Sequence, residues 1–353
     1  MQKSTQTLTI KLTNRIFRQM EAFYGYRLPD AGTETTVFRS CNVIDGLHKG
    51  FVVAPFRQDR HSVLSFTEGV NADVAMLDAL AEAIADRDSL PESTTREQHR
   101  TEVERMISEI KAQKLNKSVA ARQLAVKRDT SLSETFMHLC REYPEAFIFC
   151  FGCDATGVWI GASPEILISG KNGVLTSMAL AGTRSAGATG AWDEKNIMEH
   201  NVVRDFIRDA FEAADLHAET GETHTAEAGP VEHLRTYITG RIPDYGEADS
   251  KTAGKLALRL SPTPALCGYP VDPAMRLIDS CEDFDRSYYG GFCGPCHSDS
   301  DFSFFVNLRS MRCVHGGCVL YAGGGINEMS DPDDEWAETE KKLSTLLRCL
   351  ESG

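Results

Sequence analysis

Acidic side chains fall at two places where the sequence predicts buried apolar residues. The periodicity predicts a helix over 193–216 with Val203, Phe206 and Ala210 on one face, and Glu199 continues that face one turn toward the N-terminus. Burying a carboxylate is costly unless it is paired or binds a metal ion. Glu199 is therefore a candidate metal ligand; the alternative is a helix-start residue that turns to solvent.

A second helix is predicted over 330–350, with Ser330 as its N-cap. It carries Glu335, Glu338 and Lys342, and the last two stand at the spacing of a surface ion pair. Glu199 and Glu338 would also form an oxygen site suited to Mg²⁺ if the two helices met. The spacing leaves both interpretations open.

Glu165 follows a proline in the segment Ala162–Glu165, at the start of a predicted strand with apolar residues on both sides. An apolar environment raises the pKa of a carboxyl group because it disfavours the charged form. A carboxyl that stays protonated near neutral pH can act as a general acid. A strand-start residue that faces water is the alternative.

Two further segments are suited to anions. Three consecutive glycines in Ala322–Gly325 follow a predicted strand and expose backbone N–H groups, although a tight turn explains them equally well. This is not a P-loop, because no Gly-Lys-Ser/Thr follows. Arg309 comes after the apolar run Phe304–Leu308, where an arginine usually meets a carboxylate through its planar guanidinium. An edge-strand position is the alternative.

The cysteines suggest a different kind of function. Cys293 and Cys296 have the spacing of a redox dithiol, and His297 extends it to a haem-attachment pattern. A redox dithiol opens a helix, whereas this segment is predicted to be a loop that enters a strand. Cys150 and Cys153 lie within one predicted strand and point to opposite faces, so they cannot bind one metal ion. A thiol redox or metal-binding protein acting through Cys293 and Cys296 remains the alternative from another class.

The composition excludes several classes of protein. The chain has 353 residues, 42% hydrophobic and 25% charged, as in globular domains. Its 37 basic and 51 acidic residues give a net charge of −14, which disfavours nucleic acid and anionic membranes as partners. No stretch of about 18 uncharged apolar residues could span a bilayer, and the first residues lack the apolar core of a secretion signal. We therefore expect a cytoplasmic protein whose 11 cysteines are reduced.

The remaining pattern predicts an α+β fold. A helix is expected over 95–114, and short apolar runs predict strands over 118–126, 146–153, 157–160, 165–168, 174–181, 302–312 and 318–322. Their close spacing favours antiparallel neighbours over βαβ units. No repeat or linker is evident, so we expect a single domain over 1–353 with sheets inside and helices outside.

Eight motifs occur in one order: GASPEILI, ALAGTR, EH at 199–200, HL at 233–234, SPTPALCGYP, FDRSYYGG, LYAGGGI and DPDDEWAETEKKL. Together they resemble the chorismate-utilising enzymes, and most closely the isochorismate synthases among them. The resemblance runs from about Lys114 to the C-terminus, so 96–353 is the expected catalytic core and 1–95 match weakly. It implies a large antiparallel β-sandwich-like core wrapped by helices, in agreement with the α+β pattern.

The resemblance also implies roles for individual residues. Lys117 matches the base that activates a water molecule, and Glu165 matches the acid that protonates the departing hydroxyl. Glu199 and Glu338 match the two Mg²⁺ ligands. The other matches are substrate-binding positions, with Lys342, Arg309 and the Gly323 backbone for the two substrate carboxylates and Gly182, His233, Ala265 and Leu266 for the rest of the pocket.

The implied reaction converts chorismate to isochorismate with Mg²⁺: water adds at C2, the C4 hydroxyl leaves and the double bonds shift. It would feed menaquinone synthesis, which we favour, or siderophore synthesis. A monomer is expected, with an oligomer left open. Ala181 stands where aminodeoxychorismate synthases have a nucleophilic lysine, and Lys117 where anthranilate synthases generally have glutamine, so both activities are disfavoured. Salicylate synthases share Lys117 and the glutamates and remain an alternative.

Overall fold

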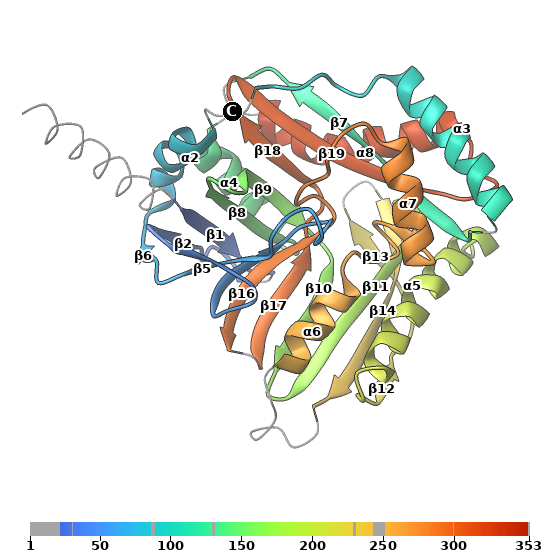
Figure 1. Cartoon of the computed structure of the whole chain (residues 1–353), viewed down its shortest axis with the longest axis horizontal. Helices are drawn as coiled ribbons and strands as arrows, with labels where there is room; N and C mark the ends of the chain where they lie inside the picture. Colours follow the sequence, from blue (N-terminus) through green and yellow to red (C-terminus); the bar gives the residue numbers. More distant parts are fainter. Residues whose placement is uncertain are drawn as a thin grey trace, which may run out of the picture.

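The computed structural model describes residues 22–29, 31–85, 89–113, 115–128, 131–228, 231–242, 251–298 and 300–351. Residues 1–21, on which the expectation about secretion rests, lie outside this part of the chain. Two antiparallel sheets pack against each other, with helices on their outer faces (Figure 1). The predicted α+β class and its sandwich-like core are confirmed.

The first sheet has nine strands in the order β15-β7-β19-β18-β9-β8-β1-β2-β6. Their bounds are β15 Gly268–Tyr269, β7 Lys117–Val126, β19 Gly317–Ile326, β18 Ser310–Val314, β9 Gly157–Ser163, β8 Phe147–Cys153, β1 Phe23–Arg27, β2 Thr36–Arg39 and β6 Val70–Asn71. All its neighbouring strands are antiparallel, as the short connections predict.

The second sheet has ten strands, nine of them in the order β12-β14-β11-β10-β17-β16-β4-β5-β3, and β13 also pairs with β14. Their bounds are β12 Ala218–Thr220, β14 Val231–Arg241, β11 Val174–Ser185, β10 Ile166–Lys171, β17 Asp301–Val306, β16 Phe292–Ser298, β4 Gly50–Ala54, β5 Leu64–Thr67, β3 Asn42–Asp45 and β13 His224–Ala228. The weakly matched N-terminal part therefore supplies strands to both sheets.

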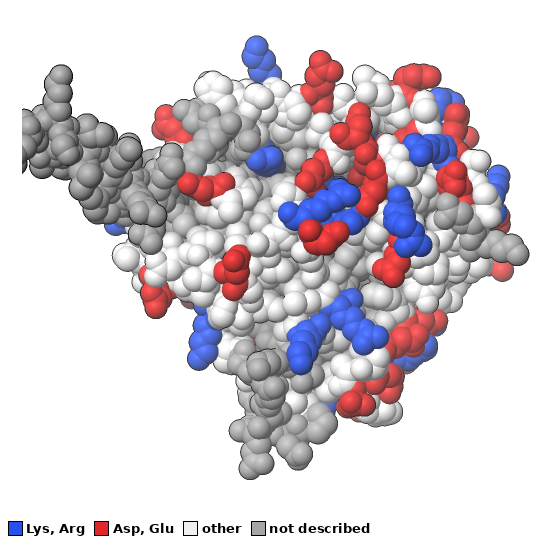
Figure 2. Space-filling view, in the orientation of Figure 1, with Lys and Arg blue, Asp and Glu red and all other residues white. Residues whose placement is uncertain are grey.

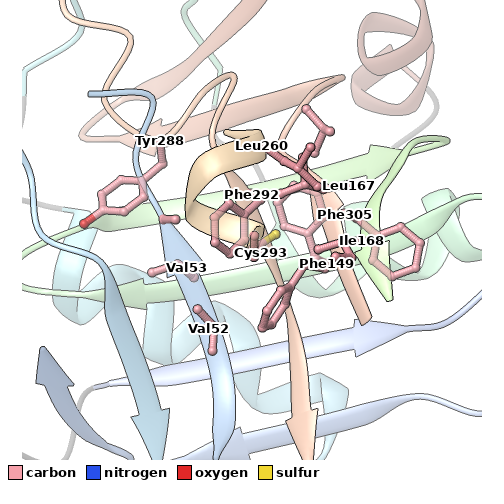
Figure 3. Close-up of a cluster of buried hydrophobic side chains, with 14 of the residues drawn as sticks. Val52, Val53, Phe149, Leu167, Ile168, Leu260, Tyr288, Phe292, Cys293 and Phe305 are labelled. Carbon is pink, nitrogen blue, oxygen red and sulfur yellow. The ribbon is translucent and has the colours of Figure 1, made fainter. Parts of the chain in front are cut away.

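The core between the sheets is aromatic. Phe147 of β8 stacks on Phe305 of β17, with ring centroids 4.1 Å apart and planes 8° apart. Figure 3 shows Phe149 and Cys293 in the same cluster, both excluded from solvent. Burial of each large aromatic side chain contributes about 1.5–3 kcal/mol to folding. The sandwich is therefore a packed scaffold.

Helices cover the outer faces of both sheets. In Figure 1, α5 and α6 lie along the second sheet, and α3, α7 and α8 lie over β7 and β19. Helices α2 and α4, with the short helix η1, cover the other part of the first sheet. Their bounds are η1 Val74–Met76, α2 Leu77–Ala85, α3 Arg96–Gln113, α4 Leu132–Glu142, α5 Glu194–Glu212, α6 Lys251–Leu260, α7 Val271–Cys281 and α8 Pro332–Glu351.

Three sequence-based predictions about local structure are wrong. The predicted strand over 302–312 is two strands, β17 and β18, in different sheets. The segment from Cys293 to Cys296 is part of strand β16, not a loop. The cap of α8 is Asp331, which accepts hydrogen bonds from the backbone N–H groups of Asp333 (2.9 Å) and Asp334 (3.2 Å), whereas the Ser330 hydroxyl binds Glu335.

Charges on the visible surface are mixed. On the face shown in Figure 2, most Lys and Arg side chains lie in small groups beside acidic ones. Ion pairs of this kind occur in the structure, since Arg57 contacts Asp59 (2.7 Å) and also Asp279. Of the helices in the described ranges, none is long and apolar enough to cross a membrane.

Candidate functional site

One cavity between the sheets collects the side chains that the sequence singled out. It is lined by residues of β7, β11, β14, β19, α5 and α8 and of the connections between β9 and β10, α6 and β15, α7 and β16, and β17 and β18. All eleven predicted site residues line it: Lys117, Glu165, Gly182, Glu199, His233, Ala265, Leu266, Arg309, Gly323, Glu338 and Lys342. Residues more than 200 positions apart in the chain therefore face the same space.

Two crossings of the chain between the sheets form one wall of the cavity. Glu165 lies between β9 of the first sheet and β10 of the second, and Arg309 lies between β17 and β18. The crossings are hydrogen-bonded to each other, since Val306 N–H donates to Glu165 O (3.0 Å) and Ala162 N–H to Arg309 O (3.1 Å). β17 ends at Val306, and Arg309 has a φ of 47°, a left-handed conformation that lets the chain turn into β18.

Glu165 is buried, which removes the alternative of a residue facing water. Glu165 is only 2% exposed, and its Oε1 atom has no hydrogen-bond partner in the structure. Burial raises the pKa of Glu165 to about 8, although Lys117 and Arg309 act in the opposite direction. The group is therefore protonated at neutral pH, as a general acid must be.

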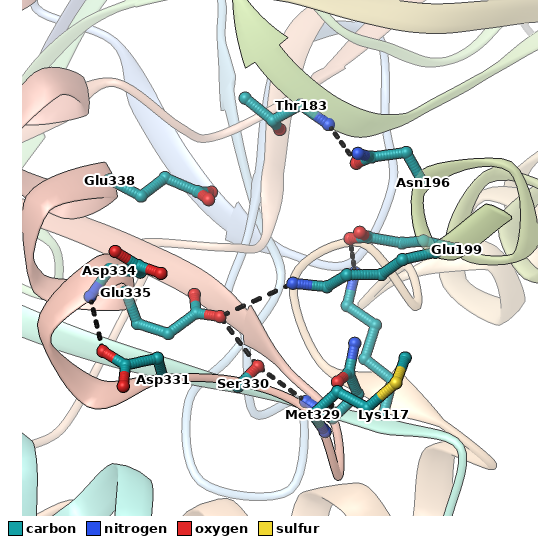
Figure 4. A network of polar contacts seen from close by, with 12 residues as sticks. Lys117, Thr183, Asn196, Glu199, Met329, Ser330, Asp331, Asp334, Glu335 and Glu338 are labelled. Atoms are coloured by element: carbon teal, nitrogen blue, oxygen red, sulfur yellow. Dashed lines mark hydrogen bonds and ion pairs between the residues drawn. The ribbon is translucent and has the colours of Figure 1, made fainter. Parts of the chain in front are cut away.

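Lys117 begins β7 and contacts Glu199 of α5. The Lys117 Nζ atom donates a hydrogen bond to Glu199 Oε1, and Figure 4 shows the two side chains meeting. Gly325 of the neighbouring β19 makes room for them, because a Cβ atom at that position would lie 2.5 Å from Lys117 Cε and 3.0 Å from Glu199 Oε1. A side chain at position 325 would displace the pair.

Polar contacts on both sides of Glu199 hold α5 in place. The Asn196 side chain accepts a hydrogen bond from the Thr183 N–H (2.9 Å), beside a bulge in β11. His200 is buried and its Nε2 atom lies 2.7 Å from Thr236 Oγ1 of β14. At the bulge, Gly182 has a φ of 76° and a Cβ atom there would lie 3.0 Å from the Asn196 carbonyl oxygen. These contacts direct Glu199 into the cavity.

Glu338 and Lys342 of α8 form an ion pair inside the cavity. Lys342 Nζ lies 2.7 Å from Glu338 Oε1 and also donates to the Gly323 carbonyl oxygen at 2.7 Å. Burial opposes ionisation of Glu338, but the charge and hydrogen bond of Lys342, together with the charges of Lys117 and Lys195, outweigh it and lower the pKa of Glu338. The pair has the spacing of a surface ion pair yet belongs to the cavity wall.

His233 is a neutral hydrogen-bonding group in the same wall. Burial lowers the pKa of His233 to about 4, and Arg309 acts in the same direction. Its Nδ1 atom lies 3.0 Å from the Gly182 carbonyl oxygen, which can only accept, so Nδ1 carries the proton. The Nε2 atom is then the acceptor of the neutral ring.

Comparison with known proteins identifies the family. The family model for chorismate-binding enzymes matches residues 59–351. The chain belongs to the chorismate-binding enzymes. It is 30% identical over 277 residues to isochorismate synthase EntC of Escherichia coli, covering 75% of this chain and 69% of that protein. It is also 30% identical over 273 residues to isochorismate synthase DhbC of Bacillus subtilis, covering 72% and 68%.

The fold agrees with this assignment. The structure of MenF, the menaquinone-specific isochorismate synthase of Escherichia coli, superposes with a TM-score of 0.77, covering 94% of this chain and 89% of that one at 21% identity. This likeness shows that the chain has the fold of the chorismate-binding enzymes.

The donor set of this chorismate-binding enzyme fits Mg²⁺. Within the described ranges, no three His, Cys, Asp or Glu side chains group as a metal site made by protein alone. Mg²⁺ is commonly held by one or two carboxylates together with water and a substrate anion. Glu199 and Glu338, two carboxylates from different helices lining one cavity, match that requirement.

Two residues near the site received no role from the sequence. Glu335 of α8 accepts a hydrogen bond from Ser330 Oγ (2.7 Å), and burial raises the pKa of Glu335 to about 7 (Figure 4). Tyr289 lines the cavity and stacks on Tyr321 with centroids 5.4 Å apart. Both lie inside motifs that carry the resemblance, DPDDEWAETEKKL and FDRSYYGG. Their position in those motifs was the one feature of the sequence that could have indicated a role in the site.

The thiol alternative is not supported. Cys293 and Cys296 are buried in β16, and burial raises the pKa of Cys293 well above its ordinary value. A buried thiol that stays protonated is unreactive. Cys150 and Cys153 lie in different core clusters, on opposite faces of β8, as the strand period predicts.

A larger hollow, of about 1460 Å³, lies between α2, α4 and the hairpin of β18 and β19. It is open to solvent and none of the eleven predicted site residues lines it. Buried acids with shifted pKa values beside cationic side chains indicate a functional site more strongly than the volume of a cavity does. We therefore place the site in the smaller cavity.

Proposed function

We propose that the protein is an isochorismate synthase that acts in the cytoplasm on chorismate and requires Mg²⁺. The observation that carries the proposal is the meeting of Lys117, Glu165, Glu199 and Glu338 in one cavity. The relatives EntC and DhbC, both named isochorismate synthases, support it. We also propose that residues 22–351 act as one domain, because β1–β6 complete both sheets.

The charges of the cavity suit a dianionic substrate. Lys117, Arg309 and Lys342 are cationic, Glu199 and Glu338 are carboxylates, and Glu165 is neutral below pH of about 8. The protein as a whole has a net charge of −14, so the excess of cationic side chains in the cavity is a local exception. Arg309 offers a planar fork for one substrate carboxylate, and Lys342 offers a point charge for the other.

In the proposed reaction, Lys117 is cationic when the substrate binds and then gives its proton to solvent. The resulting amine takes a proton from a water molecule, whose oxygen attacks C2 of chorismate. The double bonds shift and the C4–oxygen bond breaks. Glu165 gives its proton to the departing hydroxyl, which leaves as water, so one water is consumed and one released. His233 Nε2 is placed to accept a hydrogen bond from a substrate hydroxyl.

Glu199 and Glu338 would hold Mg²⁺, which supplies Lewis-acid stabilisation of charge on the substrate when it is bound. The protein contributes the orientation of these two carboxylates through α5 and α8. Asn196 and His200 fix α5, and the ion pair with Lys342 fixes Glu338.

The test is incubation with chorismate and Mg²⁺, followed by chromatographic separation of products. We expect isochorismate to accumulate to equilibrium, with no product after chelation by EDTA. Glu199→Gln should lose most of this activity, and Glu82→Gln, an exposed residue of α2, is the matched control. Accumulation of salicylate would instead establish the alternative activity, and unreacted chorismate would refute both.

A further inference from the structure

A buried arginine outside the cavity binds two of the segments that form it. Arg286 and Glu282 have side chains only 2% and 3% exposed. Arg286 Nε donates to Glu282 Oε2 at 2.7 Å, and Arg286 Nη2 also contacts Glu282 Oε1. The same guanidinium donates to the carbonyl oxygens of Val119 (2.7 Å) and Leu266 (2.8 Å). Its donors are thus divided between an acid and two backbone carbonyls.

These contacts extend the hydrogen bonding of β7, near the edge of the first sheet, beyond the point where the last strand, β15, ends. The short strand β15 pairs with only Lys117 and Ser118 of β7. Further along β7, the Val119 carbonyl oxygen accepts from Arg286, and the Ala121 N–H donates to Glu282 Oε1 at 2.9 Å. Two side chains therefore satisfy backbone groups of an edge strand that a neighbouring strand would otherwise bind.

Both bound segments belong to the site. Val119 lies two residues after Lys117 on β7, and its side chain would be 3.0 Å from a Cβ atom on Gly323. Leu266 lines the cavity directly. A movement of β7 relative to the Leu266 loop would shift the Lys117 amine, and misplacement of a reacting group by about 1 Å can lower the rate about 100-fold.

We propose that Arg286, fixed by Glu282, is a positioning residue that clamps strand β7 to the Leu266 loop and so sets the place of the Lys117 amine. The inference rests on the proposed function, in which Lys117 activates water. Arginine suits the task because its rigid planar fork reaches the acid and both carbonyls at once, whereas a lysine ammonium is a single point charge on a flexible chain.

The experiment compares Arg286→Lys with a matched control, Arg27→Lys. Arg27 is equally buried and donates to the carbonyl oxygens of Tyr143 (2.6 Å), Pro144 (2.7 Å) and Ala146 (3.0 Å). It lies on β1, separated from β7 by β19, β18, β9 and β8. Both substitutions break a buried arginine clamp, but only one clamp holds the site.

We expect Arg286→Lys to lower kcat about 10- to 100-fold while KM for chorismate changes less than about threefold, since Arg286 does not contact Arg309 or Lys342, to which the substrate carboxylates are assigned. Arg27→Lys should keep kcat within about twofold even if its Tm falls. Wild-type kcat in Arg286→Lys, or an equal loss in Arg27→Lys, would overturn the inference.

Glu282→Gln provides a second variant should Arg286→Lys fail to fold. It leaves both carbonyl contacts possible and removes the charged partner, so we expect a several-fold fall in kcat, and wild-type kcat would overturn the inference. Absence of isochorismate from the wild-type enzyme would overturn the proposed function as well. If the wild type forms isochorismate and neither variant loses kcat, this inference is overturned while the proposed function stands.

Discussion

Glu165→Gln should remove activity and at the same time change how stability depends on pH. Glu165 is buried with a pKa of about 8, against an ordinary value of 4.5. A carboxyl whose pKa is higher in the folded state stabilises the fold fully below the unfolded pKa, and this contribution is lost as the pH rises through the folded pKa. Glutamine has no proton to bind, so it lacks this dependence.

The magnitude follows from the two pKa values. One unit of pKa corresponds to about 1.4 kcal/mol, so keeping Glu165 protonated costs about 3 kcal/mol at pH 7 and about 1 kcal/mol at pH 5. The free energy of unfolding of Glu165→Gln, relative to wild type, should therefore rise by about 2–3 kcal/mol between pH 5 and pH 7. The test is how this difference changes with pH. The new amide in the buried site also alters the free energy of unfolding, but by an amount that does not depend on pH.

Urea unfolding at pH 5, 6 and 7 measures this difference, with Glu82→Gln as the control for losing one exposed carboxylate. Wild-type kcat should also fall as the pH rises through about 8, since the acid form is lost. A difference in unfolding free energy that stays constant from pH 5 to pH 7 would refute the assignment of Glu165 as a buried protonated acid.

Three further predictions address the other groups. Lys117→Ala should abolish turnover while chorismate still binds, as measured by calorimetry; near-full activity would remove Lys117 as the base. Glu199→Gln should weaken Mg²⁺ binding by at least about tenfold, and an unchanged affinity in a metal titration would exclude it as a ligand. Cys293→Ala and Cys296→Ala should each retain chorismate turnover in a product assay, because both thiols are buried in the core; loss of turnover in folded variants would favour the thiol alternative.

Local structure could be predicted from the sequence where one face of a helix or strand is buried, because apolar residues then recur at the period of that element. The stripe through Val203 and Ala210 marked α5, and both residues are buried in the structure. Alternation likewise placed Cys150 and Cys153 on opposite faces of β8. The burial of Glu165 was one of two open interpretations, because its neighbours indicate an apolar shell but not whether a second sheet covers it.

Other features depend on contacts that no local pattern shows. The predicted strand over 302–312 is divided between two sheets, with a turn at the left-handed Arg309, and the apolar run before that residue gives no local signal for the break. Ser330 and Asp331 are both good caps, and only the backbone geometry chooses between them. The pairing of Lys117 with Glu199 joins residues 82 positions apart, so it follows from the packing of α5 against the sheets.

The central claim is that water is the nucleophile and that the C4 hydroxyl is lost. Turnover of chorismate in water enriched in oxygen-18, followed by mass spectrometry of the isochorismate formed, tests it directly. The account predicts one labelled oxygen, in the new hydroxyl at C2. Isochorismate that carries no label after a single turnover would show that the hydroxyl migrates within the substrate and would contradict the roles of Lys117 and Glu165.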